Sequence, residues 1–211
     1  MASQYDRVTE SDKPTEAFAG IWIPPEPIFI DADSRDPLGT SPEERIPAMT
    51  PMAEISGGGG KYAPIRRTLA DGGCLTNAKV VPVTETTMFA VGDVVRVVAQ
   101  ADPTAASDEL GTIDSISDGV SITLEANAVT AVVSGDIIEV AENALAERAV
   151  ILREDVDVRN EEHTAVDTPG VGVIGAQLRE SALNYCTAGG ICLTRLRYEL
   201  DQMDIVPATV G

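Results

Sequence analysis

The chain has 211 residues, of which 34 are acidic and 15 basic, and its net charge at pH 7 is −19. This charge argues against nucleic acid and anionic membranes as partners, because their phosphates are bound by Lys and Arg. Hydrophobic residues make up 44% of the chain but aromatic residues only 4%, so we expect a core of Val, Ile, Leu and Ala. Side chains branched at Cβ favour strands, which predicts a mainly β protein.

Residues 1–60 are rich in proline and are predicted to form a long extended arm. Eight of the thirteen prolines lie in this part, and proline lacks the backbone donor that a helix or a central strand needs. Apolar side chains on an extended segment usually dock on another surface, so two apolar runs in the arm are candidate partner-binding segments. The candidate residues are Ile21, Trp22, Ile23, Ile28, Phe29 and Ile30.

Four consecutive glycines at 57–60 predict a flexible joint. We place a domain boundary here, between the arm of residues 1–60 and a β-rich domain of residues 61–211. The start of the chain, 1–10, is polar, and no apolar run reaches the length of a membrane span, so we expect neither a secretion signal nor a membrane segment.

Strand and turn patterns alternate through the β-rich domain. A Gly-Asp pair followed by a β-branched run occurs twice, at the entries to 94–98 and 137–140, and each Gly is expected to occupy a tight turn. Between them, 111–126 is typical of a hairpin that turns at Ser117-Asp118-Gly119. Two strand entries that flank a hairpin predict a small β-barrel or curled sheet.

The end of the domain is predicted to add short helices at 143–148 and 176–185, a strand at 149–152 and a final strand at 191–200. In that final strand Arg195 and Arg197 would alternate with apolar residues and share one face. We list them as candidate contacts to a neighbouring subunit. The alternative is a pair of exposed charges that offset nearby carboxylates.

The segment 170–175 matches the Gly-x-Gly-x-x-Gly pattern of dinucleotide-binding loops. That mechanism needs a buried strand running directly into the first glycine. The preceding residues, 161–169, are polar and have the character of a loop. We therefore expect a glycine-rich strand that bends or passes close to another backbone.

The acidic run of Asp31, Asp33 and Asp36 is spaced like part of a calcium loop. An EF-hand would need an oxygen ligand and then a glycine where Arg35 and Asp36 stand, so we expect a solvated acidic turn. The single histidine, His163, lies in a polar stretch and is expected to be an exposed loop residue.

The three cysteines, Cys74, Cys186 and Cys192, show no Cys-x-x-Cys spacing and are expected to be buried free thiols. With one histidine and no convincing nucleophile, we expect no metal centre, no cofactor and no enzymatic activity.

In its order of features the chain resembles the capsid decoration proteins of tailed phages, the group that includes the lambda head decoration protein. This resemblance implies a small β-rich module without enzymatic activity that sits on the outer capsid, often as a trimer, and clamps major capsid subunits. The long Pro-rich segment departs from the short arm of the lambda-like members. The resemblance covers about residues 61–200 and rests on Gly92-Asp93, 111–126, Gly135-Asp136, 149–158 and 171–178.

From the resemblance we expect a structural virion protein that binds the outer surface of the capsid and stabilises the major capsid protein, its expected partner. Before assembly it would lie in the host cytoplasm, and on the capsid it would form a homotrimer. The alternative is a soluble small-barrel module that binds a peptide or small ligand in a concave apolar pocket.

Overall fold

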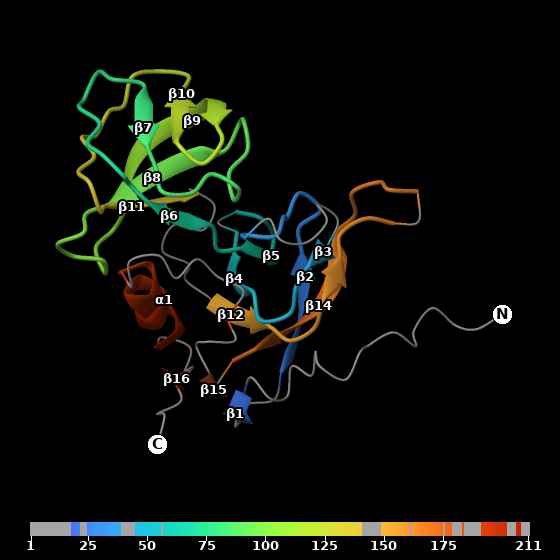
Figure 1. Ribbon diagram of the computed structural model, residues 1–211. Coiled ribbons are helices and arrows are strands. Elements are labelled where there is room, and N and C mark those ends of the chain that lie inside the picture. Colours follow the sequence, from blue (N-terminus) through green and yellow to red (C-terminus); the bar gives the residue numbers. More distant parts are fainter. Residues whose placement is uncertain are drawn as a thin grey trace.

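In the part of the chain that it describes, the computed structural model shows two β-lobes with one helix, α1 (Ile191–Asp201), at their junction (Figure 1). The mainly β fold class with a barrel and a curled sheet is confirmed. No helix in the described residues is long and apolar enough to cross a membrane. The residues described are 18–21, 25–38, 45–55, 57–140, 149–160, 162–174, 176–178, 183, 191–201 and 206–207.

The first lobe, which we call the sheet lobe, is a six-stranded antiparallel sheet in the order β6-β11-β8-β9-β10-β7. The sheet curls until its two edge strands meet at one end, where Asp71 N donates to Pro82 O (3.0 Å) and Thr84 N donates to Leu69 O (2.9 Å). Its strands are β6 (Arg67–Leu69), β7 (Val80–Pro82), β8 (Val94–Val98), β9 (Asp108–Ser117), β10 (Ser121–Leu124) and β11 (Ile137–Val140).

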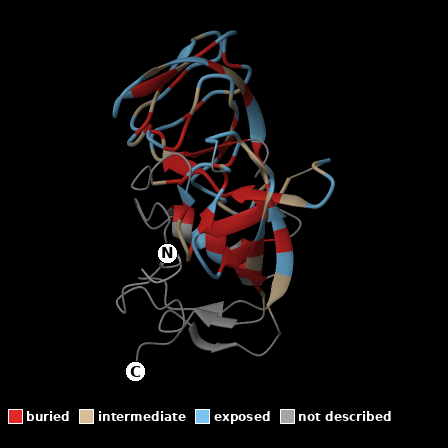
Figure 2. Cartoon of the chain, turned by 90° about the vertical axis from the view of Figure 1, so that its right-hand side faces the viewer, coloured by how far each residue is buried: buried red, intermediate tan, exposed pale blue. Residues whose placement is uncertain are grey.

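The second lobe, the barrel lobe, is a closed five-stranded barrel in the order β12-β14-β2-β5-β4. β2 pairs with β5 in parallel, and the other four strand pairs of the barrel are antiparallel. Buried residues follow the strands of both lobes (Figure 2). The strands of the barrel are β2 (Glu26–Ile30), β4 (Pro51–Glu54), β5 (Lys61–Pro64), β12 (Ala149–Leu152) and β14 (Thr168–Val173).

Two smaller sheets complete the described structure. One pairs β3 (Arg45–Ile46) with β13 (Val156–Asp157). The other joins β1 (Phe18–Ile21), β15 (Ala176–Leu178) and β16 (Val206–Pro207), in the order β1-β15-β16.

Helix α1 makes the two lobes share a core. Its residues Cys192, Leu196 and Leu200 pack in one buried cluster with residues of both lobes, among them Ile137 on β11 and Ile151 on β12. Each of these strands turns one face to the interior of its own lobe, and α1 covers the other face. Both strands are therefore buried along their whole length. The predicted strand at 149–152 is confirmed, and the structure buries it on both sides.

The predicted arm of residues 1–60 is corrected by the structure where it is described. β2 is a strand of the closed barrel and pairs with β14 on one side and β5 on the other. β4 is the next strand after β5 in the same barrel. Pro27 is tolerated in β2 because β5 pairs only with Phe29 and Ile30, so that at Pro27 the strand has a paired neighbour on one side alone. Pairing partners far along the chain therefore override the local effect of proline.

The predicted strand at 191–200 is wrong, because this segment forms α1. Its buried residues are Cys192, Arg195, Leu196, Glu199 and Leu200, which recur every three or four positions. Two of them are charged, so the apolar residues of the segment do not by themselves show the helical period. The helix predicted from residue 176 is also wrong at its start, where β15 forms, and the helix predicted at 143–148 lies outside the described residues.

The two Gly-Asp signatures form the same turn, as predicted. Gly92 and Gly135 both have a φ of 92°, which a residue with a Cβ adopts only with strain. In each turn the Asp carboxylate accepts a bond from the backbone N–H three residues earlier, at 2.8 Å in Asp93 and in Asp136. The hairpin at 111–126 is also confirmed, with β9 paired to β10.

Replacing Gly92 or Gly135 by valine should lower the free energy of unfolding. Both substitutions strain a positive φ, at about 1 kcal/mol or more; a Cβ at Gly135 meets only the end of the flexible, exposed Gln100 side chain, which can move, and nothing lies within 4 Å at Gly92. Urea unfolding measures both effects. Gly73→Ala is the control, because the nearest atom to its Cβ would be Val132 O at 3.5 Å. Equal stability of all three variants would contradict the turn assignment.

Candidate functional site

The outer face of β2 carries the exposed Phe29, whose side chain is 58% accessible. Alternation along β2 turns Ile28 and Ile30 into the barrel and Pro27 and Phe29 outward. Across the strand pair, Phe29 lies opposite the exposed Pro169 of β14. We call the outward side chains Pro27, Phe29 and Pro169 the Phe29 face, an apolar surface on a closed and therefore rigid barrel.

One end of the Phe29 face is bordered by a cluster of ion pairs. Lys61, opposite Phe29 on β5, places its Nζ 3.1 Å from Asp31 Oδ1 and 2.8 Å from Asp167 Oδ2. The hydrogen bonds to Asp167 and Asp31 raise the pKa of Lys61, and the bond from Lys61 lowers the pKa of Asp167. These ion pairs connect Lys61 of β5 to Asp31, which follows β2, and to Asp167, which precedes β14. The three strands next to the Phe29 face are therefore connected at this end.

The candidate residues of the two apolar runs are only partly brought to the surface. Ile28 and Ile30 are buried in the barrel core, which corrects their assignment as partner contacts, while Phe29 is exposed. Ile21 belongs to β1, where it pairs with Ala176. Trp22 and Ile23 lie outside the described residues. Burial alternates with period two along 26–30 in the structure, but Ile28, Phe29 and Ile30 are all apolar, so no sequence pattern separated the outward residue from its neighbours.

A cleft of about 410 Å³ opens between the two lobes. Its walls include Asp31 and Lys61 from the barrel lobe and Arg66, Val91 and Asp93 from the strand connections of the sheet lobe. Four of the charged groups that line it form ion pairs, since Arg66 Nη1 lies 2.8 Å from Asp93 Oδ2 and Lys61 binds Asp31, and Asp33 and Arg35 line it as well. The cleft is therefore polar, whereas the ligand-binding alternative predicted an apolar pocket.

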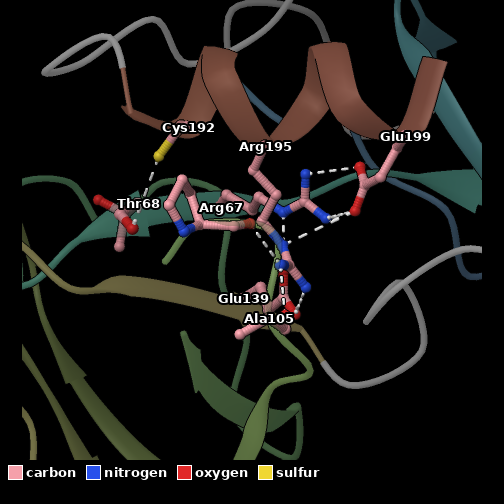
Figure 3. A network of polar contacts seen from close by, with 8 residues as sticks. Arg67, Thr68, Ala105, Glu139, Cys192, Arg195 and Glu199 are labelled. Atoms are coloured by element: carbon pink, nitrogen blue, oxygen red, sulfur yellow. Dashed lines mark hydrogen bonds and ion pairs between the residues drawn. The ribbon is translucent and has the colours of Figure 1, made fainter. Parts of the chain in front are cut away.

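A fully buried network of four charges lies between the sheet lobe and α1 (Figure 3). Glu139 on β11 accepts bonds from Arg67 Nε at 2.7 Å and from Arg195 Nε and Nη2 at 2.9 Å each. Arg67 also binds Glu199, with Nη1 at 2.8 Å from Oε2. Arg195 Nη1 donates to two backbone carbonyls, those of Pro103 and Ala105. Positive and negative charges balance within the network, as buried charges require.

The strand register extends this network into a ladder of alternating charges. Arg67 of β6 is opposite Glu139 of β11, Glu139 is opposite Arg96 of β8, and Arg96 is opposite Glu109 of β9. Opposite charges at directly paired positions stabilise neighbouring strands. Charges of alternating sign therefore stand at paired positions on four strands, and the Arg67–Glu139 step is an ion pair.

Arg195 and Arg197 do not share a face, contrary to the prediction, because they lie on a helix. Arg195 is buried in the network, and Arg197 is exposed. Arg195 is therefore a structural residue in this chain and not a surface contact. Arg195 and Glu199 are four residues apart, a spacing at which opposite charges lie next to each other on a helix. This spacing was a signal in the sequence for a helix.

The remaining motifs have structural roles where they are described. The 170–173 part of the glycine motif lies in β14, where a Cβ on Gly172 would lie 3.0 Å from Ile28 Cγ2, so the glycine-rich strand is confirmed. His163 is exposed in a loop, as predicted. Cys74 and Cys192 are buried thiols, with Cys192 Sγ 4.0 Å from Thr68 O, and Cys186 lies outside the described residues. Within the described residues no group of three His, Cys, Asp or Glu side chains could hold a metal ion.

Comparison with known proteins adds no relative to this description. No protein-family model, no curated protein and no solved structure matches the chain.

Replacing Arg195 by methionine should lower the free energy of unfolding by about 3 kcal/mol or more, because Glu139 would keep its buried charge and lose one of its two arginines. Urea unfolding of the variant measures the loss. Arg197→Met on the same helix is the matched control, and as an exposed position it should change stability by about 0.5 kcal/mol or less. Similar losses in both variants would contradict the network.

The network should also make folding sensitive to acid. Burial raises the pKa of Glu139, but the charges and hydrogen bonds of Arg67 and Arg195 lower it more, so its pKa in the folded state is below the usual value. A lowered pKa adds stability above the pKa of an unfolded glutamate, about 4.3, and this stability is lost as the pH falls through the folded pKa.

We therefore expect the stability difference between wild type and Glu139→Gln to be largest near neutral pH and to shrink below about pH 4. Urea unfolding across a pH series measures it, with the exposed Glu125→Gln as the control. A difference that is constant from neutral to acidic pH would show that Glu139 is not charged in the folded protein.

Proposed function

We propose that this chain is a structural virion protein that binds the outer surface of a tailed-phage capsid and stabilises its major capsid subunits. The observation that carries the proposal is the Phe29 face, where a large aromatic side chain is exposed on a rigid barrel. Aromatic residues at such positions commonly anchor protein interfaces. The resemblance of residues 61–200 to decoration proteins supports the choice of a capsid as the partner.

Binding at subunit junctions would stabilise a capsid through mass action. A protein that binds assembled subunits better than free ones lowers the free energy of the assembled shell. Because two strands of the predicted arm, β2 and β4, belong to the barrel, we propose docking through the outer face of β2 and not through a separate extended arm. Fixing the anchor on a barrel reduces the conformational entropy lost on binding.

The second candidate function is a module that binds a peptide or small ligand in the cleft between the lobes. The observation that favours it is the volume of the cleft, about 410 Å³, which is within the usual range of ligand sites. A ligand would have to replace ion pairs that Arg66 and Lys61 already make with Asp93 and Asp31. We place this function second for that reason.

Replacing Phe29 by aspartate should weaken capsid binding at least about tenfold, which corresponds to about 1.4 kcal/mol. The side chain is exposed in the free protein, so the loss should appear in binding and not in folding. The measurement is co-sedimentation of the purified protein with undecorated capsids assembled from the major capsid protein of the same phage. Val120→Asp, at an exposed position of the sheet lobe, is the control and should bind like wild type.

Wild-type protein that stays in the supernatant at all capsid concentrations would overturn the proposal. Binding that Phe29→Asp and Val120→Asp weaken equally would leave the capsid as partner but remove the Phe29 face as the docking surface.

A further inference from the structure

A second apolar surface lies on the sheet lobe, far along the chain from the Phe29 face. It is formed by two segments, 72–78 and 126–134, which hydrogen bonds hold side by side. Cys74 N donates to Val132 O at 3.0 Å and Val132 N donates to Cys74 O at 2.8 Å, and Ala128 N donates to Ala78 O at 2.8 Å. We call the outward side of these paired segments the uncharged face.

Large apolar side chains are exposed on the uncharged face, beside small and uncharged polar residues such as Thr76 and Asn127. Cys74, Ala128 and Val132 turn inward and pack in the core of the sheet lobe. The large apolar side chains that point outward are Leu75, which is 78% exposed, Val129 at 69% and Val133 at 64%. The exposure is not a consequence of loose chain, because the backbone hydrogen bonds hold both segments in place.

The absence of charge distinguishes this face from the rest of the chain. Neither 72–78 nor 126–134 contains an Asp, Glu, Lys or Arg, although charged residues make up 23% of the sequence and the net charge is −19. At its edges charges resume with the exposed Asp71, Lys79 and Glu125. The face thus combines exposed apolar area with a gap in the negative charge.

We infer that the uncharged face is a self-association surface, occupied by a second copy of this chain. A basic partner would gain most from the acidic surface and has no reason to select the part without carboxylates. A second copy carries the same charge of −19, and like charges brought opposite one another across an interface oppose binding. For that partner the uncharged face is where apolar area can be buried with the least repulsion.

This inference rests on the proposed function only for the number of copies, since the resemblance implies a trimer. The contact itself requires no capsid and can be tested with the free protein. Repulsion between copies acts over a distance that salt shortens, to about 10 Å at 0.1 M ionic strength. Self-association should therefore strengthen from low to moderate salt, the opposite of an interface built on ion pairs.

The test is sedimentation velocity of the full chain over a series of protein and salt concentrations. Wild type should self-associate, and Val129→Glu should weaken the association constant at least about tenfold, because it places a carboxylate on the contact of each copy. Val91→Glu is the matched control: Val91 is also exposed, at 65%, and adds the same charge beside the cleft. It should change the association constant less than about twofold.

Leu75→Ser tests the same face without adding charge and should also weaken association. Thermal melting of each variant, with a transition close to that of wild type, shows that it is folded. Wild type that is monomeric at every concentration and salt would overturn the inference, as would a loss in Val91→Glu equal to that in Val129→Glu. Capsid co-sedimentation reports on the proposed function separately, so either can fail while the other holds.

Discussion

Glu139 is buried away from water, and its charge is tolerated there because Arg67 and Arg195 both bind it. Removing an ion from water costs several kcal/mol, which only well-placed opposite charges offset. Arg67 comes from the neighbouring strand and Arg195 from α1, so the register of the sheet and the position of the helix have to be correct together. The junction between the lobes depends on this arrangement.

The same helix supplies the apolar side of the junction. Cys192, Leu196 and Leu200 pack against both lobes, and without them β11 and β12 would each expose a face. Apolar packing contributes most of the stability of such a contact, whereas buried ion pairs contribute little net stability and are strongly destabilising when broken. Apolar contacts alone would allow α1 more than one position on the core. We interpret the network as the interaction that selects one of these positions.

A rigid junction matters for a protein with an exposed apolar face on each lobe. The Phe29 face lies on the barrel lobe and the uncharged face on the sheet lobe, so contacts made through one are held in a defined direction relative to the other. The proposed role on a capsid would need contacts of two kinds, one to the surface below and one to neighbouring copies. The acidic remainder of the surface keeps free copies soluble and apart.

Features that depend on a few neighbouring residues were predictable from sequence: the Gly92 and Gly135 turns, the hairpin at 111–126 and the mainly β class. The exposed Phe29 was within a predicted binding run, but its buried neighbours were not separated from it. Only the tertiary structure placed β2 in the barrel and made 191–201 a helix with Arg195 inside. The reason is distance along the chain: Arg67 and its partner Glu199 are 132 residues apart, and no local pattern indicates that such groups meet.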